Sequence, residues 1–295
     1  MVLIPFLAIM GQSIMTKPTP KEIVKSILSI PCNSIPSKRI PYGKNSRQFG
    51  NLRIPHTSAP HPVLVIVHGG CWITKFASAK LMSPFAEALT KRGVATWNIE
   101  YRCADNRGGG WPGTFKDIGA AIDYLRVLAP KYKLDLNRVV VMGHSAGGQL
   151  ALWSGARRTF AKTNKAYVPH PLPLKAVIDL AGPTDLRKFL PMQEKCCGGP
   201  VLNQLFKTQH ITPEHFAATS PYELLPLHIK QILITGKDDP SISVPEMQDY
   251  VDHAKMLGDQ DVQLIVVENA AHFEVIDPRT KAWEQVRKVI LSCFG

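Results

Sequence analysis

Short apolar runs alternate with amphipathic segments along most of this chain. Each run is long enough for one buried strand, and the segments between them repeat apolar positions at helical spacing. The pattern predicts strands at 62–67, 94–100, 138–143, 175–181, 230–235 and 262–268. It predicts helices at 79–92, 115–129, 146–157, 245–257 and 279–292. This alternation favours an α/β fold with a mostly parallel central sheet and helices on both faces.

The predicted strand at 138–143 leads into a Gly-x-Ser-x-Gly motif, and a predicted helix follows directly (Gly143-His144-Ser145-Ala146-Gly147). This context is that of a nucleophile elbow, where the serine sits on a sharp, strained strand-to-helix turn. The flanking glycines let the turn close without side-chain clashes. A glycine-rich turn with an idle serine would contain the same letters. The strand and helix on either side favour Ser145 as a nucleophile.

A nucleophilic serine needs a base, and the base needs an orienting acid. Two aspartates, Asp238 and Asp239, follow the predicted strand at 230–235, and His272 follows the last predicted strand. This gives the chain order serine, aspartate, histidine that one group of hydrolases uses. Because these groups follow parallel strands, we expect them at one sheet edge. We favour Asp239 over Asp238, although Asp-Pro is also a common turn former.

The loop after the predicted strand at 62–67 reads His68-Gly69-Gly70-Cys71-Trp72. A His-Gly-Gly loop in this place is typical of an oxyanion hole in lipases and esterases. We expect the backbone N–H groups of Gly70, Cys71 and Ala146 to face a developing oxyanion. His68 is expected to orient the loop, or to be an ordinary strand-end histidine. Trp72 and Trp111 are candidate substrate-binding residues, and Tyr101 and Phe273 are further candidate pocket walls, although aromatic side chains more often serve the core.

With these motifs the chain resembles the α/β-hydrolase superfamily, and within it the serine esterases with His-Gly-Gly loops. It is similar to hormone-sensitive-lipase-like esterases, feruloyl-esterase-like bacterial hydrolases and kynurenine formamidase. The resemblance covers about residues 50–292 and includes the stretch between loop and elbow, with Glu100-Tyr101-Arg102, Gly110-Trp111-Pro112, Asp117 and Ala120-Ala121. It implies an α/β-hydrolase fold and acyl-transfer chemistry. The motifs say little about the substrate.

The regular alternation is interrupted after the elbow helix. Residues 183–229 are proline-rich and irregular, and we expect them to form a small cap-like insertion over the serine. Residues 159–173 form another loop insertion. A chain of 295 residues is long enough for one large domain. We therefore expect an N-terminal extension over 1–49 and a catalytic domain over 50–295.

The formal net charge of +12 raises the question of a nucleic-acid partner. The basic residues are scattered and no nucleic-acid-binding signature is present, so we expect a basic enzyme without such a partner. Positive potential could also steer an anionic substrate. The six cysteines lack metal-ligand spacing. We expect most of them to be reduced thiols, with a Cys71–Cys103 bridge left open.

The first ten residues are apolar but lack a basic start, and they are too short to span a bilayer. They match a secretion signal poorly, and Met15 is an alternative start. We therefore expect a cytoplasmic protein without stable membrane insertion, with a secretion signal left open. A homodimer is also left open.

The expected function is hydrolysis of a small carboxylic ester through an acyl-enzyme on Ser145, with no metal or organic cofactor. Arylformamidase activity is the first alternative, because of the formamidase resemblance. A small serine peptidase is a further alternative. A non-catalytic binding module is the least favoured, because serine, acid and histidine are all in place.

Overall fold

The computed structural model describes residues 18–295. The apolar N-terminal segment and the alternative start at Met15 lie outside the described residues. Within the described part, no helix is long and apolar enough to cross a membrane.

One eight-stranded sheet organises the described residues, with strand order β1-β2-β4-β3-β5-β6-β7-β8. β2 pairs antiparallel with β1 and β4, and every other pair is parallel. The mostly parallel sheet of the sequence analysis is therefore confirmed. The strands are β1 (Lys38–Pro41), β2 (Phe49–Arg53), β3 (His61–Val67), β4 (Ala95–Ile99), β5 (Leu134–His144), β6 (Ala176–Leu180), β7 (Lys230–Gly236) and β8 (Val262–Val267).

All six predicted strands are present, but the sheet begins before residue 50, where the sequence placed the domain boundary. β1 and the first residue of β2 come from the expected extension. Neither strand has an apolar run, because β1 is largely exposed and β2 carries Gly50, Asn51 and Arg53. A search for buried apolar runs therefore detects neither strand.

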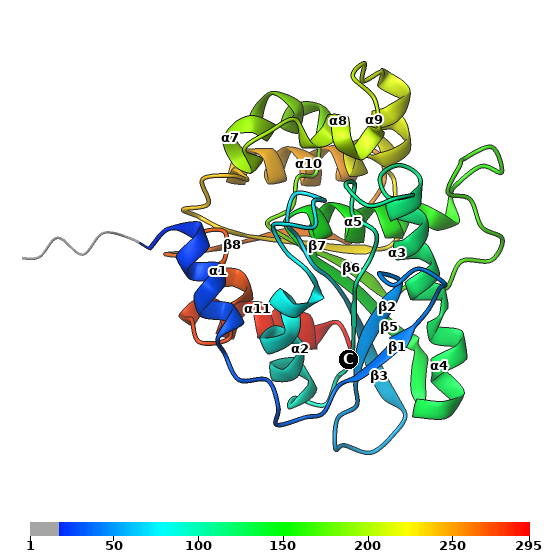
Figure 1. Ribbon diagram of the computed structural model, residues 1–295, viewed down its shortest axis with the longest axis vertical. Helices are drawn as coiled ribbons and strands as arrows, with labels where there is room; N and C mark the ends of the chain where they lie inside the picture. The colour runs from blue at the N-terminus through cyan, green and yellow to red at the C-terminus, as the bar shows by residue number, and fades with distance from the viewer. Residues whose placement is uncertain (1–17) are drawn as a thin grey trace, which may run out of the picture.

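Helices cover both faces of the sheet (Figure 1). Along β3, Val63, Val65 and Val67 belong to one core, while Leu64 and Ile66 belong to the other. The second core is completed by α1 (Pro20–Leu28), η1 (Ala79–Met82), α2 (Ser83–Thr90) and α11 (Lys281–Ser292). The first core is completed by α3 (Gly113–Asp123), α4 (Leu125–Tyr132), α5 (Ala146–Gly155) and α10 (Val244–Met256).

The single helix predicted at 115–129 is two helices, α3 and α4, which meet at Tyr124. Tyr124 keeps helical dihedral angles, φ −63° and ψ −17°. The helical spacing of apolar residues therefore continues across the junction, and the sequence pattern does not reveal the break.

The insertion at 183–229 is a set of short helices rather than an irregular loop. In Figure 1 it lies at the top of the molecule, next to α10. Its apolar side chains are buried, including Leu202, Leu205 and Phe216. The helices are α6 (Leu186–Phe189), η3 (Leu190–Met192), α7 (Gln193–Cys197), α8 (Val201–Phe206), α9 (Pro213–Thr219) and η4 (Pro221–Leu224). Each is too short to show helical periodicity in the sequence.

Candidate active site

Ser145 occupies the turn between β5 and α5, with φ 55° and ψ −125°. Any side chain on the flanking Gly143 or Gly147 would clash with the backbone around the turn. A Cβ on Gly143 would lie 1.9 Å from the carbonyl oxygen of Gly147, and one on Gly147 would lie 2.3 Å from that of Val67. Strained backbone of this kind costs about 1–3 kcal/mol and concentrates at functional sites.

The turn exposes the serine while everything around it is buried. From Val139 to Arg157, Ser145 is the one residue that is not in the buried class. Its N–H donates to the carbonyl of Leu180 at the end of β6, at 2.8 Å, which fixes the turn to the neighbouring strand. The β5–α5 junction therefore presents a single hydroxyl at the sheet edge.

His272 and Asp239 form a hydrogen-bonded pair at the same edge. His272 Nδ1 lies 2.7 Å from Asp239 Oδ2, and the side chains are 13% and 0% exposed. The loops that carry them follow β8 and β7, whose ends are paired through Gly236 and Val267. Asp238, the alternative acid, is exposed instead. The structure thus brings Asp239, and not Asp238, against the histidine.

The environment of Asp239 favours its ionised form. Burial raises the pKa of Asp239, whereas the hydrogen bond and positive charge of His272 lower it. The lowering effects together are larger, so the pKa lies below its ordinary value. The N–H groups of Ser241 and Ile242 donate to Oδ1 at 2.8 and 3.2 Å. A carboxylate held in this way can fix the tautomer of His272 and stabilise its imidazolium.

His144, inside the serine motif, positions the His272 loop. Its Nε2 lies 2.8 Å from the carbonyl oxygen of His272, and the two rings are 4.7 Å apart. Burial, with the nearby charge of His272, lowers the pKa of His144 to about 3, so the ring is neutral and donates through Nε2. The residues predicted from the sequence do not include His144. The only signal was its place next to Ser145, where the motif allows any side chain.

The His-Gly-Gly loop packs directly against the elbow. The ends of β3 and β5 are paired through Val67 and Gly143. A Cβ on Gly69 would lie 2.9 Å from the Cβ of Ser145, so only glycine permits this approach. Residues 70–72 all have positive φ, at 98°, 51° and 58°. Such conformations are sparsely populated for residues other than glycine.

The loop conformation leaves backbone donors free beside the serine. Among residues 18–295, the N–H groups of Gly70, Cys71 and Ala146 make no hydrogen bond. Ala146 is also the first residue of α5, whose N-terminus carries partial positive charge. Free, preorganised N–H donors near a nucleophile suit the stabilisation of an oxyanion.

The BD-FAE family matches this chain over residues 52–253, which include the loop, the elbow and the acid. The chain belongs to the BD-FAE family. Esterase LipC of Mycobacterium tuberculosis is 25% identical over 81% of this chain. The kynurenine formamidase-like hydrolase fscH of Fusarium equiseti is 28% identical over 53% of the chain. The chain spans 60% of the length of each of these relatives.

Solved structures share the fold of this BD-FAE-family protein. An esterase B from Lactobacillus rhamnosis superposes with a TM-score of 0.79, at 18% identity, over 93% of this chain and 90% of that one. A bacterial heroin esterase superposes with a TM-score of 0.73, at 20% identity, over 93% and 88%. At such identities the likeness concerns the fold, and the expected fold class is confirmed.

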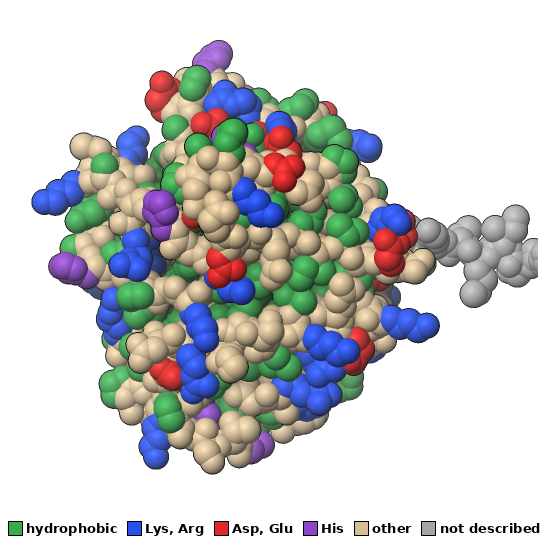
Figure 2. Space-filling model, turned by 180° about the vertical axis from the view of Figure 1, so that it is seen from behind, with side chains coloured by type: hydrophobic (Ala, Val, Ile, Leu, Met, Phe, Trp, Pro, Cys, Tyr) green, Lys and Arg blue, Asp and Glu red, His purple; other side chains and the backbone are tan. Residues whose placement is uncertain are grey.

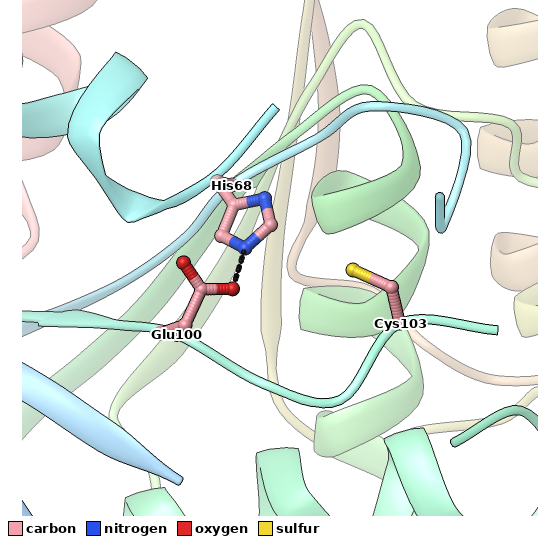
Figure 3. A group of neighbouring side chains, drawn as sticks. All are labelled: His68, Glu100 and Cys103. Atoms are coloured by element: carbon pink, nitrogen blue, oxygen red, sulfur yellow. Dashed lines mark hydrogen bonds and ion pairs between the residues drawn. The ribbon is translucent and has the colours of Figure 1, made fainter. Parts of the chain in front are cut away.

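In this BD-FAE-family protein, His68 begins the oxyanion loop (residues 68–72) and faces Glu100 (Figure 3). Its Nε2 lies 3.0 Å from Glu100 Oε1, its Nδ1 lies 2.8 Å from the carbonyl oxygen of Gly69, and its ring stacks on Tyr101 at 4.3 Å. Burial raises the pKa of Glu100, but the charge and hydrogen bond of His68 and the N–H of Ala79 bring it below its ordinary value. His68 is fully buried and thus orients the loop.

Cys103 completes a group of potential metal ligands with His68 and Glu100, whose donor atoms lie within 4.8 Å of one another. The donor chemistry does not suit a cation. Both ring nitrogens of His68 face protein oxygens. Burial and the negative charge of Glu100 raise the pKa of Cys103 to about 12, so the thiol is protonated when no metal is bound.

The two tryptophans expected in the substrate pocket lie in different environments. Trp72 is 1% exposed, donates from Nε1 to Gln149 at 3.0 Å and packs edge-on against Phe189. It therefore joins the oxyanion loop to α5 and the insertion. Trp111 is partly exposed, and its backbone N–H donates to the carbonyl of Leu205 in α8 at 2.6 Å. Trp111 remains a candidate pocket residue.

Cys71 forms a disulfide with Cys197 in α7, which corrects the Cys71–Cys103 alternative. The partners are 126 residues apart, and no local spacing could have paired them. The bridge ties the oxyanion loop to the insertion. The other described cysteines are free thiols. Disulfides of this kind are typical of oxidising compartments.

Proposed function

We propose that this protein is a serine esterase that hydrolyses small carboxylic esters through an acyl-enzyme on Ser145. The observation that carries the proposal is the 2.7 Å contact between His272 Nδ1 and Asp239. It lies at the sheet edge that exposes Ser145, and the His272 ring lies 4.7 Å from that of His144, the residue before the serine.

In the proposed mechanism, His272 removes the proton from the Ser145 hydroxyl as the oxygen attacks the acyl carbonyl. The carbonyl π electrons move to oxygen, and the N–H groups of Gly70, Cys71 and Ala146 face the resulting oxyanion. The C–O bond to the leaving alcohol then breaks, and the alcohol takes the proton from His272. Water repeats the sequence on the acyl-enzyme and releases the acid.

The relatives support an ester as substrate, since their names include an esterase and, in Arabidopsis thaliana, a probable isoprenylcysteine α-carbonyl methylesterase. A second candidate is an aryl formamide, because one relative is named a kynurenine formamidase-like hydrolase. The same groups serve either bond, since only the leaving group differs. We place the acyl pocket between the oxyanion loop and the insertion, with Trp111 as a wall.

The test is hydrolysis of p-nitrophenyl esters from acetate to decanoate, with N-formylkynurenine alongside, by wild type and Ser145→Ala. We expect serine-dependent turnover that favours short acyl chains. A much higher kcat/KM for the formamide would assign the second candidate. If neither substrate is turned over by the folded wild type, or Ser145→Ala remains active, the proposal is wrong.

A further inference from the structure

An open cavity of about 380 Å³ lies at the end of α5 opposite Ser145. It is lined by η2 (Ala156–Arg158), the start of α4 and the loop that precedes β6. With a rise of about 1.5 Å per residue, α5 separates this cavity from Ser145 by roughly 15 Å. The cavity is therefore distinct from the proposed active site.

Arginines dominate the wall of the cavity. Arg126, Arg157 and Arg158 line it, and Asp123 is the acid that pairs with them. Asp123 contacts Arg126 at 3.4 Å and also pairs with Arg157, while Arg158 has no ion-pair partner among residues 18–295. Three guanidinium groups and one carboxylate leave two positive charges. A dianion would balance them.

Arg157 is held at the cavity with unused hydrogen-bonding capacity. Its side chain is 2% exposed, and its Nη1 is buried without a hydrogen-bond partner in the described part of the chain. A buried charged donor without an acceptor is costly, so native structures rarely keep one idle. Guanidinium groups also match phosphate oxygens in geometry.

The surrounding chain reinforces the positive charge. Residues 156–178 contain five Lys or Arg residues and no Asp or Glu. In Figure 2, basic and histidine side chains gather along the left edge, the side on which the loop before β6 lies once Figure 1 is turned. The local field therefore attracts anions to this end of the molecule.

Apolar surface lies beside the arginines. Tyr167, Pro171 and Pro173 form part of the same wall. An adjoining cavity of about 300 Å³ shares Arg157 and Arg158, and Leu172, Leu227 and Ile229 line it. A ligand whose anionic group meets the arginines could thus place an apolar substituent against these side chains.

We propose that this cavity binds the phosphate group of a small phosphate monoester, with the phosphate on Arg126, Arg157 and Arg158 and the organic part on the adjacent apolar wall. Phosphate is dianionic near neutral pH, which matches the excess of two positive charges. A carboxylate would balance only one of them. The proposal is independent of the esterase reaction.

Calorimetric titration with inorganic phosphate and with phenyl phosphate, at constant ionic strength, tests the site. The variant is Arg158→Gln, because Arg158 makes no ion pair whose loss would disturb the fold. The matched control is Lys162→Gln, an exposed charge on the same loop that does not line the cavity. Thermal unfolding of each variant verifies that it is folded.

We expect saturable binding that weakens about 10-fold or more in Arg158→Gln, since a charge-assisted hydrogen bond is lost, and changes less than about twofold in Lys162→Gln. If phenyl phosphate binds more tightly than inorganic phosphate, the ligand is a phosphate monoester. If the two probes bind with equal affinity, the arginines bind the free phosphate ion. The site is refuted if neither probe saturates below about 10 mM or if both variants bind like wild type.

Discussion

Two histidine–carboxylate pairs lie near one sheet edge and differ in what surrounds them. His272 and Asp239 are 2.7 Å apart, and His68 and Glu100 are 3.0 Å apart. His272 is 13% exposed, and its Nε2 has no hydrogen-bond partner among residues 18–295. His68 is completely buried, and both of its ring nitrogens face protein oxygens.

The comparison shows that the pair alone does not define a catalytic base. A general base must present a free lone pair to the proton that it removes. His272 can do so through Nε2. Both ring nitrogens of His68 already face protein oxygens, so neither is free to accept a proton from a substrate or from Ser145. The His68–Glu100 pair instead holds the oxyanion loop in place. The following predictions test this division between a reacting pair and a supporting pair.

The largest expected effect is the loss of catalysis in His272→Gln. Loss of the base should lower kcat/KM for a p-nitrophenyl ester by about 10⁴-fold or more. The free energy of unfolding should fall less than in His68→Gln, because Asp239 keeps the N–H donors of Ser241 and Ile242. His68→Gln should instead destabilise the fold, because a buried group loses its partners. Urea unfolding and esterase kinetics on both variants separate the roles. These roles would be contradicted if His68→Gln lost as much activity as His272→Gln without being destabilised.

Asp239→Asn should lower kcat by about 10³- to 10⁴-fold, because His272 loses the acceptor that fixes its tautomer. Asp238→Asn is the matched control, since Asp238 is exposed and directly adjacent. It should retain the wild-type rate. The assignment of the acid is wrong if the two variants have the same activity.

Glu100→Gln should lower the free energy of unfolding by about 1–3 kcal/mol, because the buried Nε2 of His68 loses its carboxylate acceptor. The same change at Glu268 serves as the control. Glu268 pairs with Lys237 in solvent, at 2.9 Å, and should contribute less than about 1 kcal/mol. Chemical denaturation measures both, and similar values would show that the His68 pair has no supporting role.

Cys197→Ser should lower the free energy of unfolding by about 2–4 kcal/mol. The bridge to Cys71 closes a long loop and so reduces the conformational entropy of the unfolded chain. Cys196→Ser, which removes a free thiol one residue away, should be close to neutral. Denaturant midpoints under non-reducing conditions compare the two. If the variants are equally stable, the bridge does not hold the loop to the insertion.

The smallest expected effect is on the acid sensitivity of the fold. The pKa of Asp239 is lowered by folding, so the unfolded chain binds more protons as the pH falls. The stabilisation from Asp239 is therefore complete above its ordinary pKa of about 4 and is lost below it. The free energy of unfolding is measured between about pH 6 and pH 3, a range that brackets this pKa. It should fall less steeply in Asp239→Asn than in Asp238→Asn. An identical dependence would contradict the lowered pKa.

The parts of the site that follow strands were accessible from the sequence. Ser145, Asp239 and His272 lie within about five residues of the ends of β5, β7 and β8, and parallel strands carry such loops to one edge. The sequence narrowed the acid to two neighbours, and only the loop conformation turned Asp239 inward. β1 and β2 were missed because neither contains an apolar run, although β2 is an interior strand paired with β1 and β4.

The sequence by itself determined the α/β alternation, the elbow and the order of the reactive groups, because local periodicity and turn chemistry dictate them. Only the tertiary structure decided which cysteine is bonded to Cys71, that Trp72 is buried, that His144 holds the His272 loop and that Arg126 and Arg157 line one cavity. The physical reason is the same in each case. These contacts join segments distant in the chain, and their geometry depends on how the helices and loops pack over the sheet.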